Sequence, residues 1–175
     1  GKPLDPARLK MMAAAVKRQV ERADVIIKNM NRFAHSTDQT ITTVDLDQTI
    51  ELVIALTARF AAMRGVKVDL QLPARALTIP TAPFYLMNLL YLCLDFSMSA
   101  SGDEKRVEIV VEETENSVRI RFRRLAGLSE ALLETFPSDR EENLLAVVEG
   151  ALTAEPEREE IALRLFENID NESKR

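Results

Sequence analysis

Glycine is scarce in this sequence, and its scarcity excludes two large classes of nucleotide-binding protein. Only five of the 175 residues are glycine. Gly1 is the first residue, and the patterns around Gly65 and Gly102 predict helix ends, which leaves Gly127 and Gly150. A loop that cradles phosphate needs several glycines close together, so that backbone N–H groups can approach the anion. The chain therefore carries neither a Walker loop nor a Rossmann fingerprint.

Cysteine and histidine each occur once, and acidic residues outnumber basic ones. Cys93 alone can form neither an intramolecular disulfide nor a cysteine-rich zinc site, which favours a reducing, cytoplasmic location. A net charge of -5 argues against nucleic acid as a partner. A catalytic histidine needs a nucleophile and an orienting carboxylate, and around His35 lie only Ser36, Thr37 and Asp38 of a polar linker, so we interpret it as exposed at a helix end. We expect no catalytic residue, no metal site and no cofactor.

Long apolar runs are also missing. The longest, residues 84–96, is interrupted by Asn88 and Asp95 and is shorter than the roughly 20 residues that a bilayer span needs. No signal-peptide pattern opens the chain, and we expect no membrane contact by this fragment. The start at Gly1 without a methionine indicates a piece of a longer protein.

A long N-terminal helix is the first element that the sequence predicts. Asp5 suits an N-cap and Pro6 the first helical position, and the helix should reach His35. At ~1.5 Å per residue it would be roughly 45 Å long, too long to bury an apolar stripe against its own chain. Apolar residues recur at alternating steps of four and three, a rhythm typical of bundles. They predict a dimer interface made of Val16, Val20, Ala23, Ile27 and Met30.

The remaining residues predict an α+β fold, in which the long helix is followed by a two-layer α/β sandwich. The elements expected from capping, periodicity and alternation are a helix at 45–64, strands at 66–72 and 76–79, a buried helix at 83–99, a hairpin of strands 106–113 and 117–124, helices at 129–135 and 141–153, and a strand at 161–166. The chain then divides into a dimerisation-type helix (1–36), a linker (37–44), the sandwich (45–167) and a flexible tail (168–175).

Charged residues alternate along one predicted strand. Arg119, Arg121 and Arg123 should point outward, opposite Glu108 and Glu112 on the neighbouring strand. Cross-strand charge pairing explains the pattern, and an acidic partner docking on these arginines is the alternative. We interpret the other acidic runs, which include Glu157, Glu159 and Glu160, as solvated surface.

Three stretches resemble a sensor histidine kinase. Residues 23–36, "ADVIIKNMNRFAHS", followed by residues 44–56, "VDLDQTIELVIAL", resemble the second dimerisation helix of that family as it runs into the ATP-binding domain. Residues 88–96, "NLLYLCLDF", resemble the N box, whose usual form is N-L-L-x-N-A-x-x-A. The order of the later elements also agrees, so the resemblance covers nearly the whole chain. It implies a sandwich of the histidine-kinase ATPase type.

The sequence departs from the family at the positions that bind ATP. Asn88 and Asp95 are kept, but the family's magnesium-binding asparagine falls on Leu92. The adenine-binding motif D-x-G-x-G and the later glycine-rich box fall on Arg124, Ala126, Leu128, Glu142 and Leu144, and the lid shortens to residues 136–142. A lost hydrogen bond to a charged or polar ligand group costs about 1.5–3 kcal/mol. Losing three such contacts would weaken the binding free energy of ATP by roughly 6 kcal/mol, which lowers the affinity about 10,000-fold. The departures predict no useful ATP binding.

The resemblance and its departures together predict a non-catalytic, pseudokinase-like signalling module for dimerisation and docking in a bacterial two-component system. The expected partners are a second copy of the chain and a response regulator or another histidine kinase. One alternative is a histidine phosphotransferase in a phosphorelay, which would use a histidine outside this fragment. An active sensor histidine kinase is the other, so whether the chain belongs to an enzyme is left open.

Overall fold

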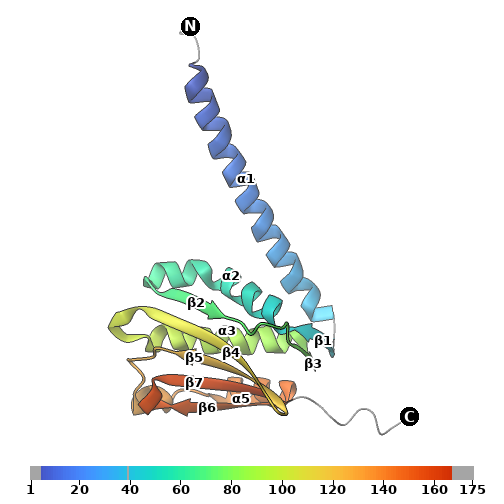
Figure 1. Cartoon of the computed structure of the whole chain (residues 1–175), viewed down its shortest axis with the longest axis vertical. Coiled ribbons are helices and arrows are strands. Elements are labelled where there is room, and N and C mark those ends of the chain that lie inside the picture. Colours follow the sequence, from blue (N-terminus) through green and yellow to red (C-terminus); the bar gives the residue numbers. More distant parts are fainter. Residues whose placement is uncertain (1–4, 39, 167–175) are drawn as a thin grey trace, which may run out of the picture.

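A computed structural model describes residues 5–38 and 40–166 and shows a long helix that projects from an α/β sandwich (Figure 1). The helix, α1 (Pro6–His35), begins and ends where the sequence predicts. The tail expected at residues 168–175 lies outside the described residues.

The two ends of α1 are fixed in different ways. At the start, the Asp5 carboxylate accepts a hydrogen bond from the Ala7 N–H at 3.0 Å, as an N-cap should. At the end, the Phe33 ring packs against Phe84 with centroids 5.8 Å apart, and Arg32 donates to the Gln48 side chain at 3.3 Å. No residue of α1 is buried, so the sandwich holds this helix only near its C-terminal end.

The sandwich is built on a five-stranded sheet of order β2-β4-β5-β7-β6. Its strands are β2 (Lys67–Gln71), β4 (Arg106–Thr114), β5 (Ser117–Arg123), β6 (Gly150–Glu155) and β7 (Glu160–Phe166). β2 runs parallel to β4, and the other neighbours are antiparallel. The helices α2 (Leu46–Arg64), α3 (Pro83–Ala100), α4 (Glu130–Leu133) and α5 (Asp139–Val148) complete the sandwich. The predicted α+β class with a two-layer sandwich is confirmed.

The core lies between α3 and the sheet. The hairpin residues predicted to face inward are all buried: Val107, Ile109, Val111, Val118, Ile120 and Phe122. They meet Leu86, Leu90 and Leu94 of α3, each at most 2% exposed. A fully buried side chain of this kind contributes about 1.5–3 kcal/mol relative to an exposed one. Helix α2 also follows the prediction, because Asp45 caps it and Gly65 ends it in the left-handed conformation at φ 68°.

Two segments differ from the prediction. Residues expected at the end of the linker form β1 (Thr42–Asp45), which pairs antiparallel with β3 (Thr78–Thr81) in a second small sheet. The helix expected to reach residue 153 ends at Val148, and Glu149 turns the chain at φ 53° into β6. β1 depends on a partner more than 30 residues along the chain, which local periodicity does not reveal, whereas β6 pairs with the next strand, β7.

Candidate functional site

The loop that follows β5 is the first candidate, because the resemblance puts the adenine-binding motif there. Three of its backbone N–H groups are already bonded inside the protein: Leu125 to the Glu159 carbonyl at 2.9 Å, Gly127 to the Ala100 carbonyl at 2.8 Å, and Leu128 to the Leu125 carbonyl at 2.8 Å. A Cβ on Gly127 would lie only 3.0 Å from the Ala100 oxygen. Gly127 therefore allows the loop to pack on the end of α3, and these amides could not turn to a ligand without breaking their present bonds.

Arg124 stands where the resemblance puts the aspartate that accepts from the adenine amino group. Its guanidinium lies 3.2 Å from the Glu104 carboxylate, and its backbone has φ 67°. Guanidinium groups only donate hydrogen bonds, so this side chain cannot accept one from an amino group. The neighbouring Ala126 and Leu128 carry side chains where the motif has glycine.

The N-terminus of α5 is the second place where a nucleotide phosphate could bind, since helix N-termini attract anions. Here the Glu141 carboxylate accepts from the Ser138 N–H at 2.8 Å and from the Ser138 hydroxyl, which makes a capping box. Glu141 is only 5% exposed, and Asp139 and Glu142 lie in the same first turn. The helix end is thus occupied by the protein's own negative charge.

The short segment before α5 closes on α3. Phe136 stacks on Phe96 with ring centroids 4.1 Å apart, and both rings are more than nine-tenths buried. Leu92 and Leu144 are partly buried and pack against the core. What is left open between α3 and α5 is a hollow of about 300 Å³ lined by Phe84, Tyr85, Asn88, Arg140, Asn143, Leu144 and Val147.

The two polar residues kept from the N box are engaged in internal contacts. The Asn88 side-chain amide donates to the Phe84 carbonyl at 2.7 Å, and Asp95 forms an ion pair with Arg64 at 2.8 Å. Between them, Cys93 is fully buried. Burial raises the pKa of the Cys93 thiol, and the nearby Glu141 carboxylate raises it further. The thiol is therefore neutral and unreactive at physiological pH.

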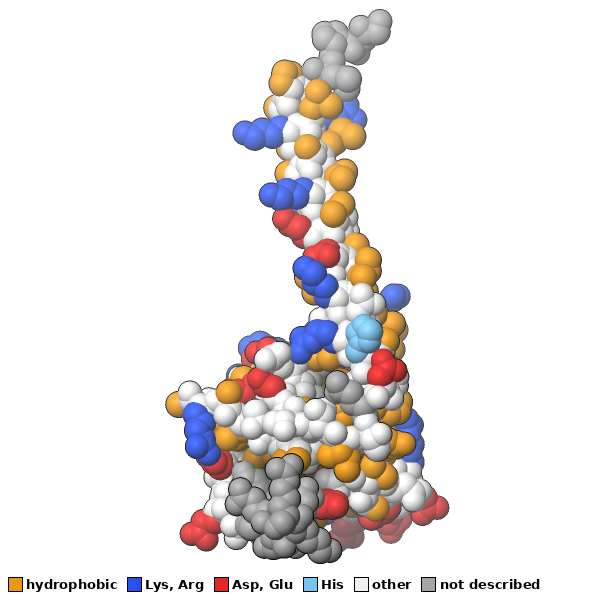
Figure 2. All heavy atoms as spheres, turned by 90° about the vertical axis from the view of Figure 1, so that its right-hand side faces the viewer, with side chains coloured by type: hydrophobic (Ala, Val, Ile, Leu, Met, Phe, Trp, Pro, Cys, Tyr) orange, Lys and Arg blue, Asp and Glu red, His pale blue; other side chains and the backbone are white. Residues whose placement is uncertain are grey.

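The apolar stripe of α1 is the second candidate site. Val16, Val20, Ile27 and Met30 are 55–63% exposed, and Ala23 is also exposed. Figure 2 shows hydrophobic side chains along most of the projecting helix. Residues 5–38 and 40–166 do not cover the stripe, and the dimer interface stays a prediction.

A further apolar strip on α1, which sequence reasoning missed, faces α2. Val25 and Ile26 are more than half exposed, and they line a hollow between the two helices. The signal was present in the sequence: Met12, Ile26 and Phe33 lie at multiples of seven residues, beside the predicted stripe.

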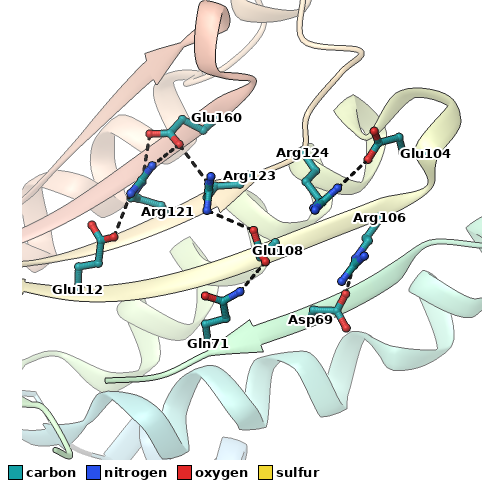
Figure 3. Close-up of polar contacts among 10 residues, drawn as sticks. All are labelled: Asp69, Gln71, Glu104, Arg106, Glu108, Glu112, Arg121, Arg123, Arg124 and Glu160. Carbon is teal, nitrogen blue, oxygen red and sulfur yellow. Dashed lines mark hydrogen bonds and ion pairs between the residues drawn. The ribbon is translucent and has the colours of Figure 1, made fainter. Parts of the chain in front are cut away.

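An ion-pair network covers the outer face of the sheet (Figure 3). Arg121 donates to both oxygens of Glu160, at 3.1 and 2.7 Å, and to Glu112 at 2.9 Å. Arg123 reaches Glu108 at 3.3 Å. The hydrogen bonds to Glu160 raise the pKa of Arg121. The predicted cross-strand pairing is confirmed for Arg121 and Arg123, whereas Arg119 forms no ion pair within the described residues.

The interpretation of Glu160 as solvated was wrong. Its side chain is 2% exposed, because β7 pairs with β5 and sets Glu160 directly opposite Arg123. The sequence alone did not show that β7 is the neighbour of β5.

His35 lies where it was predicted, at the exposed end of α1. Its side chain is 82% exposed, and its Nδ1 lies 3.5 Å from the Asp38 carboxylate.

Within residues 5–38 and 40–166, no three histidine, cysteine or acidic side chains lie together as metal ligands would. No helix in those ranges is long and apolar enough to cross a bilayer.

Neither a protein-family model nor a curated protein matches this sequence. Solved structures do match it. The catalytic domain of histidine kinase ThkA superposes with a TM-score of 0.60 at 15% identity, over 73% of this chain and 95% of that one. The histidine kinase AdeS of Acinetobacter baumannii gives 0.59 at 11% identity, over 95% and 87%.

A second ThkA structure, in complex with the response regulator TrrA, gives a TM-score of 0.59 at 14% identity, over 95% of this chain and 53% of that one. At such identities the matches establish the fold alone. The sandwich and its leading helix have the fold of histidine kinases.

Proposed function

We propose that this chain is a non-catalytic, histidine-kinase-like signalling module that serves dimerisation and docking in a bacterial two-component system and does not bind ATP usefully. The fold supports the first part of the proposal, because solved histidine kinases share it. The second part is supported by the loop after β5 and by the start of α5.

The bonded amides of the loop after β5 carry the proposal. A phosphate binds through free backbone N–H donors, and the adenine amino group donates to a carboxylate acceptor. In this loop the N–H groups of Leu125, Gly127 and Leu128 are bonded internally, and Arg124 replaces the acceptor. At the N-terminus of α5, Glu141 places a carboxylate that would repel a phosphate.

The docking role is proposed from α1 and from the ThkA complex. The stripe through Val16, Val20 and Ile27 is apolar and open, which suits a two-fold interface between copies. ThkA, which shares the fold, was solved bound to a response regulator. We therefore expect a response regulator or another histidine kinase as the partner of this module.

Titration calorimetry with Mg-ATP tests the absence of nucleotide binding. The expected result is no saturable heat below about millimolar ATP, which corresponds to a binding free energy weaker than about -4 kcal/mol. A dissociation constant in the micromolar range would overturn the proposal.

Thermal unfolding with and without 5 mM Mg-ATP gives an independent reading. A site with a dissociation constant of 10 µM would stabilise the folded chain by about 3.7 kcal/mol under these conditions. We expect no such shift, and magnesium chloride at the same ionic strength, without nucleotide, serves as the matched control.

A further inference from the structure

The hollow between α1 and α2 has apolar walls and a basic rim. It measures about 760 Å³ and is lined by Arg22, Val25, Ile26, Asn29, Met30, Ala55, Leu56, Ala58, Arg59 and Ala62. The only charged residues among these are two arginines, one on each helix. Neither Arg22 nor Arg59 forms an ion pair within the described part of the chain. This hollow, together with its rim, is called the α1–α2 groove below.

The shape of the α1–α2 groove fits a helix. Ala55, Ala58 and Ala62 recur at steps of three and four, so they share one face of α2 and leave room above it. Ile26 and Met30 form the opposite wall and are 53% and 55% exposed. An amphipathic helix binds such a groove through apolar residues at similar spacing.

The positive charge on α1 favours an acidic partner helix over a basic one. α1 carries seven Lys and Arg residues (Arg8, Lys10, Lys17, Arg18, Arg22, Lys28 and Arg32) against the acidic Glu21 and Asp24, a net +5, whereas the whole chain has -5. Glu21 and Asp24 are already paired with Lys17 and Lys28. A basic helix would be repelled from this rim, and an acidic one attracted to it.

We propose that the α1–α2 groove binds an acidic amphipathic helix of a partner, with its apolar ridge on Ile26, Met30 and Leu56 and its carboxylates on Arg22 and Arg59. The inference rests on the proposed docking role and adds the chemistry of the partner. The α1 helix of a second copy is itself basic, so it fits the uncharged stripe through Val20 and Ile27 better than this groove; Met30 lies at the border of the two surfaces.

Two synthetic helical peptides test the inference. Both carry the same leucine heptads over 28 residues, and the flanking positions are all Glu in one peptide and all Lys in the other. Fluorescence anisotropy with the 175-residue chain should show binding of the Glu peptide and at least tenfold weaker binding of the Lys peptide, with the difference shrinking in high salt.

Charge reversal in the groove should invert this preference. The variant Arg22→Glu with Arg59→Glu should bind the Glu peptide about tenfold or more weakly than the wild type does, and it should bind the Lys peptide more tightly. The matched control, Arg140→Glu with Arg164→Glu, changes the net charge equally on α5 and β7, and it should behave like the wild type. Circular dichroism checks that each variant is folded.

Three results would overturn the inference. Equal affinity of the wild type for both peptides would show that charge does not select the partner. If the control variant lost as much affinity for the Glu peptide as the groove variant, the effect would arise from net charge alone. Binding of neither peptide, with binding instead to vesicles of mixed phosphatidylserine and phosphatidylcholine, would identify a membrane surface. The dimer-breaking variant Val20→Glu with Ile27→Glu should still bind the Glu peptide, which separates this inference from the proposed dimer.

Discussion

The helices α1 and α3 use apolar residues in opposite ways. In α3, Leu86, Leu90 and Leu94 are at most 2% exposed and pack against the sheet. In α1, Val16 and Val20 are more than 60% exposed, and no residue is buried. Apolar area stabilises a fold only when it leaves water, so α3 stabilises this chain and α1 has its apolar area available for another molecule.

The difference also separates the part of the molecule that holds the core from the part that we propose to associate. The sandwich has its own core and two sheets, and the backbone N–H groups of Leu125, Gly127 and Leu128 in the loop after β5 are bonded internally. The projecting helix has an N-cap and a short anchor at its C-terminal end. Variants in the two regions should therefore change different measurements.

The largest effect on stability should come from the core of the sandwich. Leu94→Ala removes a side chain that is 1% exposed, and the lost burial and the remaining cavity should lower the free energy of unfolding by about 2–5 kcal/mol. Val20→Ala, the control on α1, should lower it by less than about 0.5 kcal/mol in the monomer. Urea denaturation measures both, and equal losses would contradict the separation of the two regions.

The second-largest effect on stability should come from the buried ion pair of Glu160 and Arg121 on the outer face of the sheet. Glu160→Ala leaves the Arg121 guanidinium, which is 18% exposed, without its main partner, and should lower the free energy of unfolding by about 2–3 kcal/mol. The exposed neighbour Glu157 is the control, and Glu157→Ala should change it by less than about 0.5 kcal/mol. If the double variant Glu160→Ala with Arg121→Ala is no more stable than Glu160→Ala alone, the loss does not arise from the uncompensated charge.

The smallest effect on the free energy of unfolding should come from Asp69 on the edge strand β2, and it should depend on pH. Hydrogen bonds from Lys67 and Arg106 hold the pKa of Asp69 below its ordinary value of 3.8. A carboxylate with a lowered pKa stabilises the folded state above its ordinary pKa, and this contribution is lost as the pH falls through the folded-state value. Wild type should exceed Asp69→Asn slightly in unfolding free energy at pH 7 and lose that advantage towards pH 2. High salt should reduce the difference at pH 7, because Asp69 lies at the surface.

Local signals in the sequence were sufficient for α1, α2 and the central hairpin, but not for the end of α5. Asp5 and Asp45 mark helix starts, Gly65 marks an end, and the alternation from Val107 to Phe122 marks inward-facing strand residues. Each of these features depends on neighbours a few residues away. The resemblance to histidine kinases added the order of elements, which the solved structures share.

Features that depend on distant pairing could not be predicted in this way. β1 becomes a strand because β3, more than 30 residues later, lies beside it, and Glu160 becomes buried because β7 pairs with β5. The α1–α2 groove depends on the angle at which α1 leaves the sandwich, which the apolar spacing of α1 does not specify. For the candidate nucleotide site, the resemblance predicted which residues are changed, and the structure added the internal bonds of Leu125 and Gly127.

Sedimentation equilibrium of the wild-type chain and of the variant Val20→Glu with Ile27→Glu tests most directly that association resides in α1. Burying the stripe across a two-fold axis removes several large side chains from water, at about 1.5–3 kcal/mol for each that is fully buried. We predict a dimer for the wild type at tens of micromolar and a monomer for the variant, with the sandwich still folded by circular dichroism. The control variant Ala14→Glu with Lys28→Glu, on another face of α1, should remain a dimer. A wild-type chain that sediments as a monomer at these concentrations would contradict the account.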